Sequence, residues 1–163
     1  MVTSTITREQ VLEWLSEVPD PEIPVLTITD LGIVREVTVN DAVVVDLTPT
    51  YSGCPATEVI EQSVVDTLRD NGIEDVQIKR VLSPPWTTDW ITEDGRNKLR
   101  DYGIAPPAEG GSKRDLLYGK RAIACPRCAS QHTQVVSEFG STACKASYKC
   151  NDCLEPFEYF KCI

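Results

Sequence analysis

Cys125-Pro126-Arg127-Cys128 and Cys150-Asn151-Asp152-Cys153 decide the fold of the C-terminal part of this 163-residue chain. Each segment places two sulfur atoms on one tight turn, and 21 residues lie between the two segments. That spacing is typical of a β-hairpin that brings two such turns, called knuckles, into one tetrahedral site. Four thiolates are typical of a structural zinc site, although they also suit iron. We therefore predict an all-β zinc ribbon over residues 120–163, with one zinc ion per chain held by Cys125, Cys128, Cys150 and Cys153.

The same tail contains other side chains that can bind metals. With Cys144 and Cys162 the tail has six cysteines, more than the four thiolates that a mononuclear site uses. We interpret Cys144 and Cys162 as small buried residues of the ribbon, and the alternatives are a second metal or cluster site, or a redox pair. His132 is expected on the surface, because four cysteines already complete the site. Ala129 follows the first knuckle, where glycine would ease the turn, so we expect either some backbone strain or a shifted turn there.

Residues 1–104 are predicted to form a small α+β domain with an α-β-β-α-β order and a three-stranded sheet. The pattern Thr7-Arg8-Glu9-Gln10 is that of a capping box at the start of a helix. Two β-branched runs separated by Asn40-Asp41 predict a hairpin, and an apolar stripe at helical spacing follows them. The expected strands lie at residues 33–39, 42–47 and 75–82, and the expected helices lie between Thr7 and Pro19 and between Pro55 and Asn71.

The segment after the third expected strand is less regular. Residues 88–102 are predicted as a helix that Gly95 weakens. Residues 105–119 contain two prolines and three glycines, and we predict a linker there.

Cys54 is the one cysteine outside the tail, and it follows Gly53 at the expected start of a helix. Unpaired N–H groups and the positive end of the helix dipole stabilise a thiolate there. The histidine is distant in sequence, so a cysteine–histidine hydrolase is poorly supported, whereas a ligand for iron or a cluster, or a sulfur-handling thiol, fits better. The alternative is an inert, half-buried cysteine. Three acidic residues could flank this site: Asp20, Glu22 and Asp30. The simpler alternative is that they cap helices or form turns.

Charge and composition exclude several classes of protein. The formal net charge is −9, and residues 105–163, with 6 acidic and 8 basic side chains, show no basic stripe for phosphates, so we expect no nucleic acid partner. No apolar run is long enough to span a membrane, and the start MVTSTITREQ does not predict a secretory signal. Cysteine pairs without an export signal fit the reducing cytosol, so we expect a cytoplasmic protein.

Three motifs of the first domain carry a resemblance to a known family. They are Asp20-Pro21-Glu22-Ile23-Pro24, Asp30-Leu31-Gly32-Ile33-Val34 and Thr50-Tyr51-Ser52-Gly53-Cys54-Pro55. They resemble the small domain of SufT-type iron–sulfur cluster assembly factors. The tail, with Phe139 to Lys145, Glu155-Pro156-Phe157 and Phe160-Lys161-Cys162, resembles the PaaD family, whose members are encoded with bacterial phenylacetyl-CoA epoxidases.

The resemblance implies an accessory role in phenylacetate catabolism, as a component of the epoxidase system rather than as an independent enzyme. Members of this family are thought to support the assembly or delivery of iron–sulfur clusters, and the epoxidase reductase carries such a cluster. The implied partners are the reductase or other epoxidase subunits and the iron–sulfur assembly machinery, with a transient cluster as cargo. Cys54 matches the cysteine of the domain family, and Thr50 belongs to the same motif.

Other roles remain open at the level of sequence. The chain could be a structural subunit of the epoxidase complex, or an electron carrier with its own cluster. A second copy of the chain is a further candidate partner, in a homo-oligomer.

Overall fold

The structure is a computed structural model that describes residues 6–107 and 122–161. The chain forms two compact units that divide between Trp86 and Thr87. Each unit has its own sheet, and we describe each unit by itself. Within the described ranges, no helix has the length and the hydrophobicity to cross a lipid bilayer.

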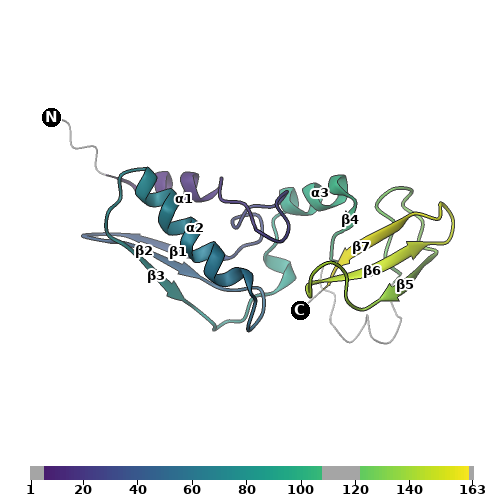
Figure 1. The fold of residues 1–163 in the computed structure, drawn as a ribbon. Helices are drawn as coiled ribbons and strands as arrows, with labels where there is room; N and C mark the ends of the chain where they lie inside the picture. Colours follow the sequence, from purple (N-terminus) through teal and green to yellow (C-terminus); the bar gives the residue numbers. More distant parts are fainter. Residues whose placement is uncertain (1–5, 108–121, 162–163) are drawn as a thin grey trace. The chain divides into compact units, whose positions relative to one another are not determined.

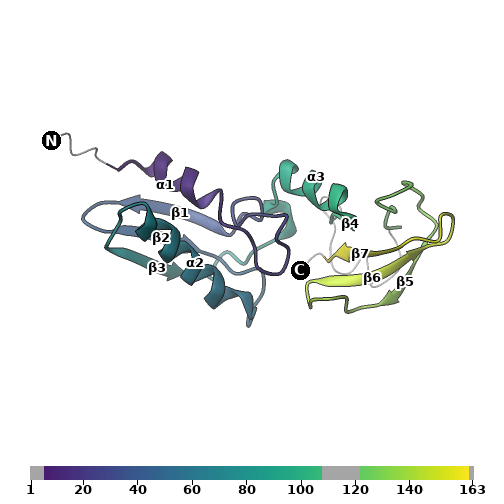
Figure 2. The same ribbon diagram turned by 45° about the horizontal axis from the view of Figure 1, so that its top comes forward.

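The first unit is a three-stranded sheet with two helices on the same face (Figures 1 and 2). Strand β1 pairs antiparallel with the central strand β2, and β2 pairs parallel with β3. The helix between β2 and β3 provides the crossover that a parallel pair needs. The elements are α1 (Arg8–Leu15), β1 (Val34–Val39), β2 (Val43–Leu47), α2 (Ala56–Asp70) and β3 (Val76–Arg80).

Local sequence signals account for these elements. The side chain of Thr7 accepts a hydrogen bond from the N–H of Gln10, and the side chain of Gln10 accepts one from the N–H of Thr7. This capping box satisfies two donors at the start of α1. Helix α2 buries one stripe of side chains at helical spacing, which consists of Ala56, Ile60, Val64 and Leu68. The predicted α+β fold with a three-stranded sheet is confirmed.

The second unit contains a four-stranded sheet in the order β4-β7-β6-β5. Strands β5, β6 and β7 pair antiparallel, and β4 pairs parallel with β7. The elements are the 3-10 helix η1 (Thr88–Trp90), α3 (Glu93–Tyr102), β4 (Ile104–Ala105), β5 (Thr133–Ser137), β6 (Lys145–Cys150) and β7 (Pro156–Phe160). The helix expected over residues 88–102 is therefore two helices, separated at Ile91 and Thr92.

Residues 87–105 pack with the ribbon, whereas the sequence placed residues up to 104 with the first domain. Ile104 lies opposite Glu158 of β7, and Ala105 lies opposite Tyr159. Both β4 side chains are buried, so this short strand adds apolar area to a small ribbon core. A strand of two residues has no periodicity, which is why the sequence pattern did not reveal it. The predicted linker begins at the second residue of this strand, and its residues 108–119 lie outside the described part of the chain.

The ribbon core contains two of the predicted metal ligands. Its buried members are Ala105, Ile123, Cys125, Cys150, Phe157 and Tyr159. Tyr148 packs against this cluster, stacked on Phe157 with ring centroids 5.8 Å apart. One cysteine of each knuckle is thus fixed by the same apolar packing that holds the strands together.

Candidate functional site

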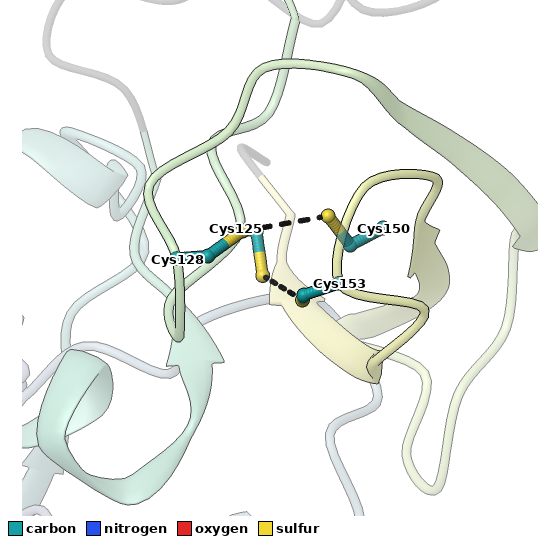
Figure 3. A group of neighbouring side chains, drawn as sticks. All are labelled: Cys125, Cys128, Cys150 and Cys153. Atoms are coloured by element: carbon teal, nitrogen blue, oxygen red, sulfur yellow. Dashed lines mark hydrogen bonds between the residues drawn. The ribbon is translucent and has the colours of Figure 1, made fainter.

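The four cysteines of the two knuckles point toward one another (Figure 3). Their sulfur atoms all lie within 4.8 Å of one another. The Sγ atoms of Cys125 and Cys153 are 3.7 Å apart, and those of Cys128 and Cys150 are 3.6 Å apart. Across the described residues, no other group of three or more cysteine, histidine, aspartate or glutamate side chains is close enough to hold a metal ion.

The spacing of these sulfur atoms fits zinc. A tetrahedral zinc ion with zinc–sulfur distances of about 2.3 Å requires sulfur atoms about 3.8 Å apart. Both short distances across the knuckles are close to that value. The donor set, four thiols without a carboxylate, is that of a closed structural site.

Backbone turns set the position of each sulfur atom. In the first knuckle, the N–H of Cys125 donates to the carbonyl of Ser130, and the N–H of Ala129 donates to the carbonyl of Cys125. Ala129 has a φ of +61°, in the left-handed region that is unfavourable for a residue with a Cβ, so of the two expected alternatives the backbone shows strain. Leu154, in the corresponding position after Cys153, has a φ of +64°. The sequence analysis did not predict strain at Leu154. Its position one residue after the second knuckle, equivalent to that of Ala129, would have indicated it.

The acidity of the thiols differs within the site. Hydrogen bonds from the N–H groups of Cys153 and Asp152 lower the pKa of Cys150 to about 7, against burial of the thiol. The N–H of Glu155 acts to lower the pKa of Cys153, but burial and the neighbouring sulfur atoms raise it to about 12. Four thiolates in one place repel one another, so a cation is needed to ionise all of them together.

The site is buried on one side only. Cys125 and Cys150, the first cysteine of each knuckle, are 2% and 0% exposed. Cys128 and Cys153, the second cysteine of each knuckle, are exposed. An ion in this site would therefore be anchored to the ribbon core by two sulfur atoms and would be reached from solvent past the other two.

Cys54 lies in the loop between β2 and α2, and it is partly buried. Its N–H donates to the carbonyl of Tyr51, and its own carbonyl accepts from Thr57. The preceding Gly53 has a φ of +79° and no atom within 4 Å of the position of a Cβ, so the glycine is needed for the backbone angle and not for a close approach. Pro55 is the N-cap of α2 and makes no side-chain capping bond. Helix α2 begins at Ala56, one residue later than expected.

The acidic residues predicted to support Cys54 have structural partners. The Oδ1 atom of Asp20 accepts hydrogen bonds from the N–H groups of Glu22 and Ile23. The Oδ2 atom of Asp30 accepts one from Thr27. These contacts are those of turn residues, and none of the three acids joins Cys54 in a metal-binding group within the described ranges.

Thr48 and Thr50 begin the segment that leads to Cys54. Thr50 is partly exposed. Thr48 is 1% exposed, and its Oγ1 atom has no hydrogen-bond partner within the described structure. Buried hydroxyl groups are normally paired, so Thr48 is a feature that the sequence did not indicate.

The remaining candidates in the tail are not part of the four-cysteine group. Cys144 is buried, with its Sγ atom 3.0 Å from the Oγ1 atom of Thr142. His132 is exposed, as the sequence predicted, and its Nδ1 atom lies 3.4 Å from the Oδ1 atom of Asp152. Cys162 lies outside the described residues.

Comparison with protein families divides the chain in two. Residues 109–161 match the family described as PaaD zinc beta ribbon domain. Residues 8–80 match the family described as iron-sulfur cluster assembly protein. The two matched ranges contain the two sites described above, the four-cysteine centre and the Cys54 loop.

Individual relatives match either nearly the whole chain or a little more than half of it. A protein of Escherichia coli (strain K12), named as a putative subunit of 1,2-phenylacetyl-CoA epoxidase, is 55% identical, and the alignment covers 98% of each chain. An "Fe-S protein maturation auxiliary factor" of Porphyromonas gingivalis is 34% identical over 57% of this chain and 90% of its own. A crystal structure titled as a domain of unknown function, DUF59, from Bacillus anthracis superposes with a TM-score of 0.53, with 27% identity over 56% of this chain and 89% of its own.

Proposed function

This chain belongs to the PaaD family, and from that premise we propose that it is an accessory maturation factor of a phenylacetyl-CoA epoxidase system and not an enzyme. The observation that carries the proposal is the combination of an iron–sulfur cluster assembly domain with a four-cysteine ribbon in one chain. A relative of the first domain is named as an Fe-S protein maturation factor, and a relative of nearly the whole chain is named as an epoxidase subunit. Taken together, the two names indicate that the client is an iron–sulfur protein of the epoxidase system. We propose that this client is the reductase.

The four cysteines of the ribbon, Cys125, Cys128, Cys150 and Cys153, would hold one zinc ion. Bound zinc supplies a cross-link between the two knuckles and no reaction chemistry, because four thiolates leave no open position. The ribbon is small, and two of its core side chains are themselves cysteines of the site. The ribbon would thus depend on the metal for its fold and would offer a fixed surface to the client.

Cys54 is the residue to which we assign contact with the cluster or with a cysteine of the client. An iron–sulfur cluster takes four protein ligands, and within the described residues Cys54 belongs to no group of three or more metal-binding side chains. A cluster at Cys54 would therefore share its ligands with a client or another partner, which suits a transfer step and not storage. Thr50 and the unpaired hydroxyl of Thr48 are the polar groups at the start of the same loop. Asp20, Glu22 and Asp30 would act indirectly, by shaping the turns of the neighbouring segment.

The test is the cluster content of the reductase after co-expression with variants of this chain. Cys54→Ser should leave the fold intact and lower the iron and sulfide per reductase chain, together with the visible absorption of the cluster. Ser52→Ala, in the same exposed loop, is the matched control and should leave loading unchanged. Normal cluster loading with Cys54→Ser would overturn the proposed role of Cys54.

A second candidate function is that of a structural subunit of the epoxidase, because the name of the Escherichia coli relative includes the word subunit. A structural subunit should copurify with the oxygenase in fixed stoichiometry, and Cys54→Ser should then change neither assembly nor cluster content. Analysis of zinc, iron and acid-labile sulfide in the anaerobically purified chain separates both functions from an electron carrier. One zinc and no sulfide per chain is the expected result, whereas a resident cluster would favour the carrier.

A further inference from the structure

Side-chain contacts connect the knuckles directly, in addition to the sulfur atoms. The longest of them is the 3.4 Å contact between the Nδ1 atom of His132 and the Oδ1 atom of Asp152, and two others are shorter. The Oγ atom of Ser130, just after the first knuckle, donates to the Oδ2 atom of Asp152, inside the second. The Nη1 atom of Arg127, inside the first knuckle, donates to the Oε2 atom of Glu155 at 2.6 Å. Both contacts join residues more than 20 positions apart in the chain, so each closes the same loop that the metal would close.

The contacts lie beside the open half of the site. Arg127 precedes Cys128, and Asp152 precedes Cys153, and these are the two exposed cysteines. The buried cysteines are already held by the apolar core. Movement of the exposed cysteines away from each other is therefore opposed by the Ser130–Asp152 and Arg127–Glu155 contacts. The His132–Asp152 contact and the backbone hydrogen bond from the N–H of Asn151 to the carbonyl of His132 act in the same direction.

We propose that the Ser130–Asp152 and Arg127–Glu155 contacts are latches that keep the knuckles closed and set the rate at which the metal leaves past Cys128 and Cys153. The inference rests on the proposed zinc site. The four residues are positioning residues, because they act on the geometry of the cysteines and do not bind the ion themselves. Partners of metal ligands commonly change metal affinity by about 10- to 100-fold when they are removed.

The two latches differ in their expected response to salt. The Ser130–Asp152 contact is a hydrogen bond to a carboxylate, which is stronger than a bond between neutral groups. The side chains of Arg127 and Glu155 are 68% and 40% exposed, so water and salt weaken their ion pair. We therefore expect the hydroxyl latch, whose donor is neutral, to be nearly independent of ionic strength, and the ion-pair latch to weaken as salt is added.

The experiment measures metal release from the full-length chain. Protein loaded with Zn²⁺ is mixed with an excess of a chromogenic chelator, and the release rate is recorded at low and high salt. Ser130→Ala should accelerate release about tenfold, and Arg127→Met should accelerate it about two- to fivefold at low salt only. The double variant should exceed either single variant. Lys98→Met is the matched control, because it removes the same charge from the exposed Asp94–Lys98 pair of α3, which lies outside the two cysteine segments in the sequence.

Restoring variants separate a latch from a general loss of stability. Ser130→Thr keeps the hydroxyl and should restore slow release, and the exchange Arg127→Glu with Glu155→Arg should restore the ion pair. Loading with Co²⁺ should give the same tetrahedral thiolate spectrum in all variants, which shows that the site itself is formed.

Two sets of results would count against the latches. The proposal is overturned if Ser130→Ala and Arg127→Met release zinc at the rate of the Lys98→Met control, or if the restoring variants remain fast. A wild-type chain that binds no Zn²⁺ would overturn both the latches and the zinc site, whereas bound zinc with unchanged release rates overturns the latches alone.

Discussion

Lys145 and Glu158 form an ion pair between β6 and β7, with 3.0 Å between Nζ and Oε2. The side chain of Lys145 is 6% exposed and that of Glu158 is 28% exposed, so the pair is largely removed from water. Glu158 also accepts hydrogen bonds from the N–H and the hydroxyl of Ser141. One carboxylate therefore holds both the neighbouring strand and the turn that precedes it.

Removing the carboxylate alone should destabilise the ribbon. Glu158→Gln leaves the ammonium group of Lys145 buried without its counter-charge, and we expect a loss of about 2 kcal/mol in the free energy of unfolding. Lys145→Met combined with Glu158→Gln should recover much of this loss, because no buried charge remains. Hydrogen exchange of the β6 and β7 amides in the zinc-loaded chain measures both effects. Equal protection in wild type and Glu158→Gln would contradict the prediction.

The same pair should make ribbon stability depend on pH. Burial acts to raise the pKa of Glu158, but the hydrogen bonds from Ser141 and the ion pair with Lys145 lower it below its ordinary value of 4.5. A carboxyl group with a lowered pKa in the folded state stabilises the fold above 4.5, and this contribution is lost as the pH falls through the folded-state value. At equal metal content, the stability difference between wild type and Glu158→Gln should therefore narrow below pH 4.5. The titration of the Glu158 carboxyl carbon by NMR checks the direction, and a midpoint above 4.5 would refute it.

Gly140 is expected to be intolerant of a side chain because of the same carboxylate. A Cβ at this position would lie 2.5 Å from the Oε1 atom of Glu158 and 3.4 Å from the backbone of Lys145. Gly140→Ala should cost about 1–2 kcal/mol of ribbon stability. In a Glu158→Ala background the same substitution should cost less, since the clashing atom is gone. An equal cost in both backgrounds would mean that the carboxylate is not the obstacle.

The capping box of α1 gives a prediction for the first unit. Thr7→Ala removes the side-chain oxygen that accepts from the N–H of Gln10, and helix caps of this kind contribute about 1 kcal/mol. Thr7→Ser keeps the oxygen and should retain most of the stability. Exchange protection of the α1 amides, compared among the three chains, measures the difference.

Metal removal should affect the two units differently. With a strong chelator, the amides of β5, β6 and β7 should lose their exchange protection, because the metal contributes much of the folding free energy of a small ribbon. The amides of β1, β2 and β3 should stay protected, since that unit has its own core of buried aliphatic side chains. Cys125→Ser, which removes a buried ligand, should reproduce the pattern without a chelator. Loss of protection in both sheets would show that the units do not fold independently.

Spacing rules account for what could be predicted about the candidate sites. Each knuckle and the capping box depend on residues within four positions of one another. Local geometry of that kind can be predicted from the sequence. The hairpin β1–β2 and the stripe of α2 follow from periodicity in the same way. The prediction that acidic residues support Cys54 did not rest on local geometry of this kind. Whether Asp20 or Asp30 lies near the Cys54 loop depends on the path of the whole chain. In the structure both carboxylates accept hydrogen bonds from nearby turns.

The sequence by itself determined the four-cysteine set, the α+β order of the first unit and the family to which the chain belongs. Only the tertiary structure decided which cysteine of each knuckle is buried, that Ile104 and Ala105 join the ribbon sheet, and that Lys145 meets Glu158. The physical reason is the range of the interactions. Turns and helix caps are set by neighbours along the chain, whereas burial and ion pairs are set by strands that meet only when the whole sheet has formed.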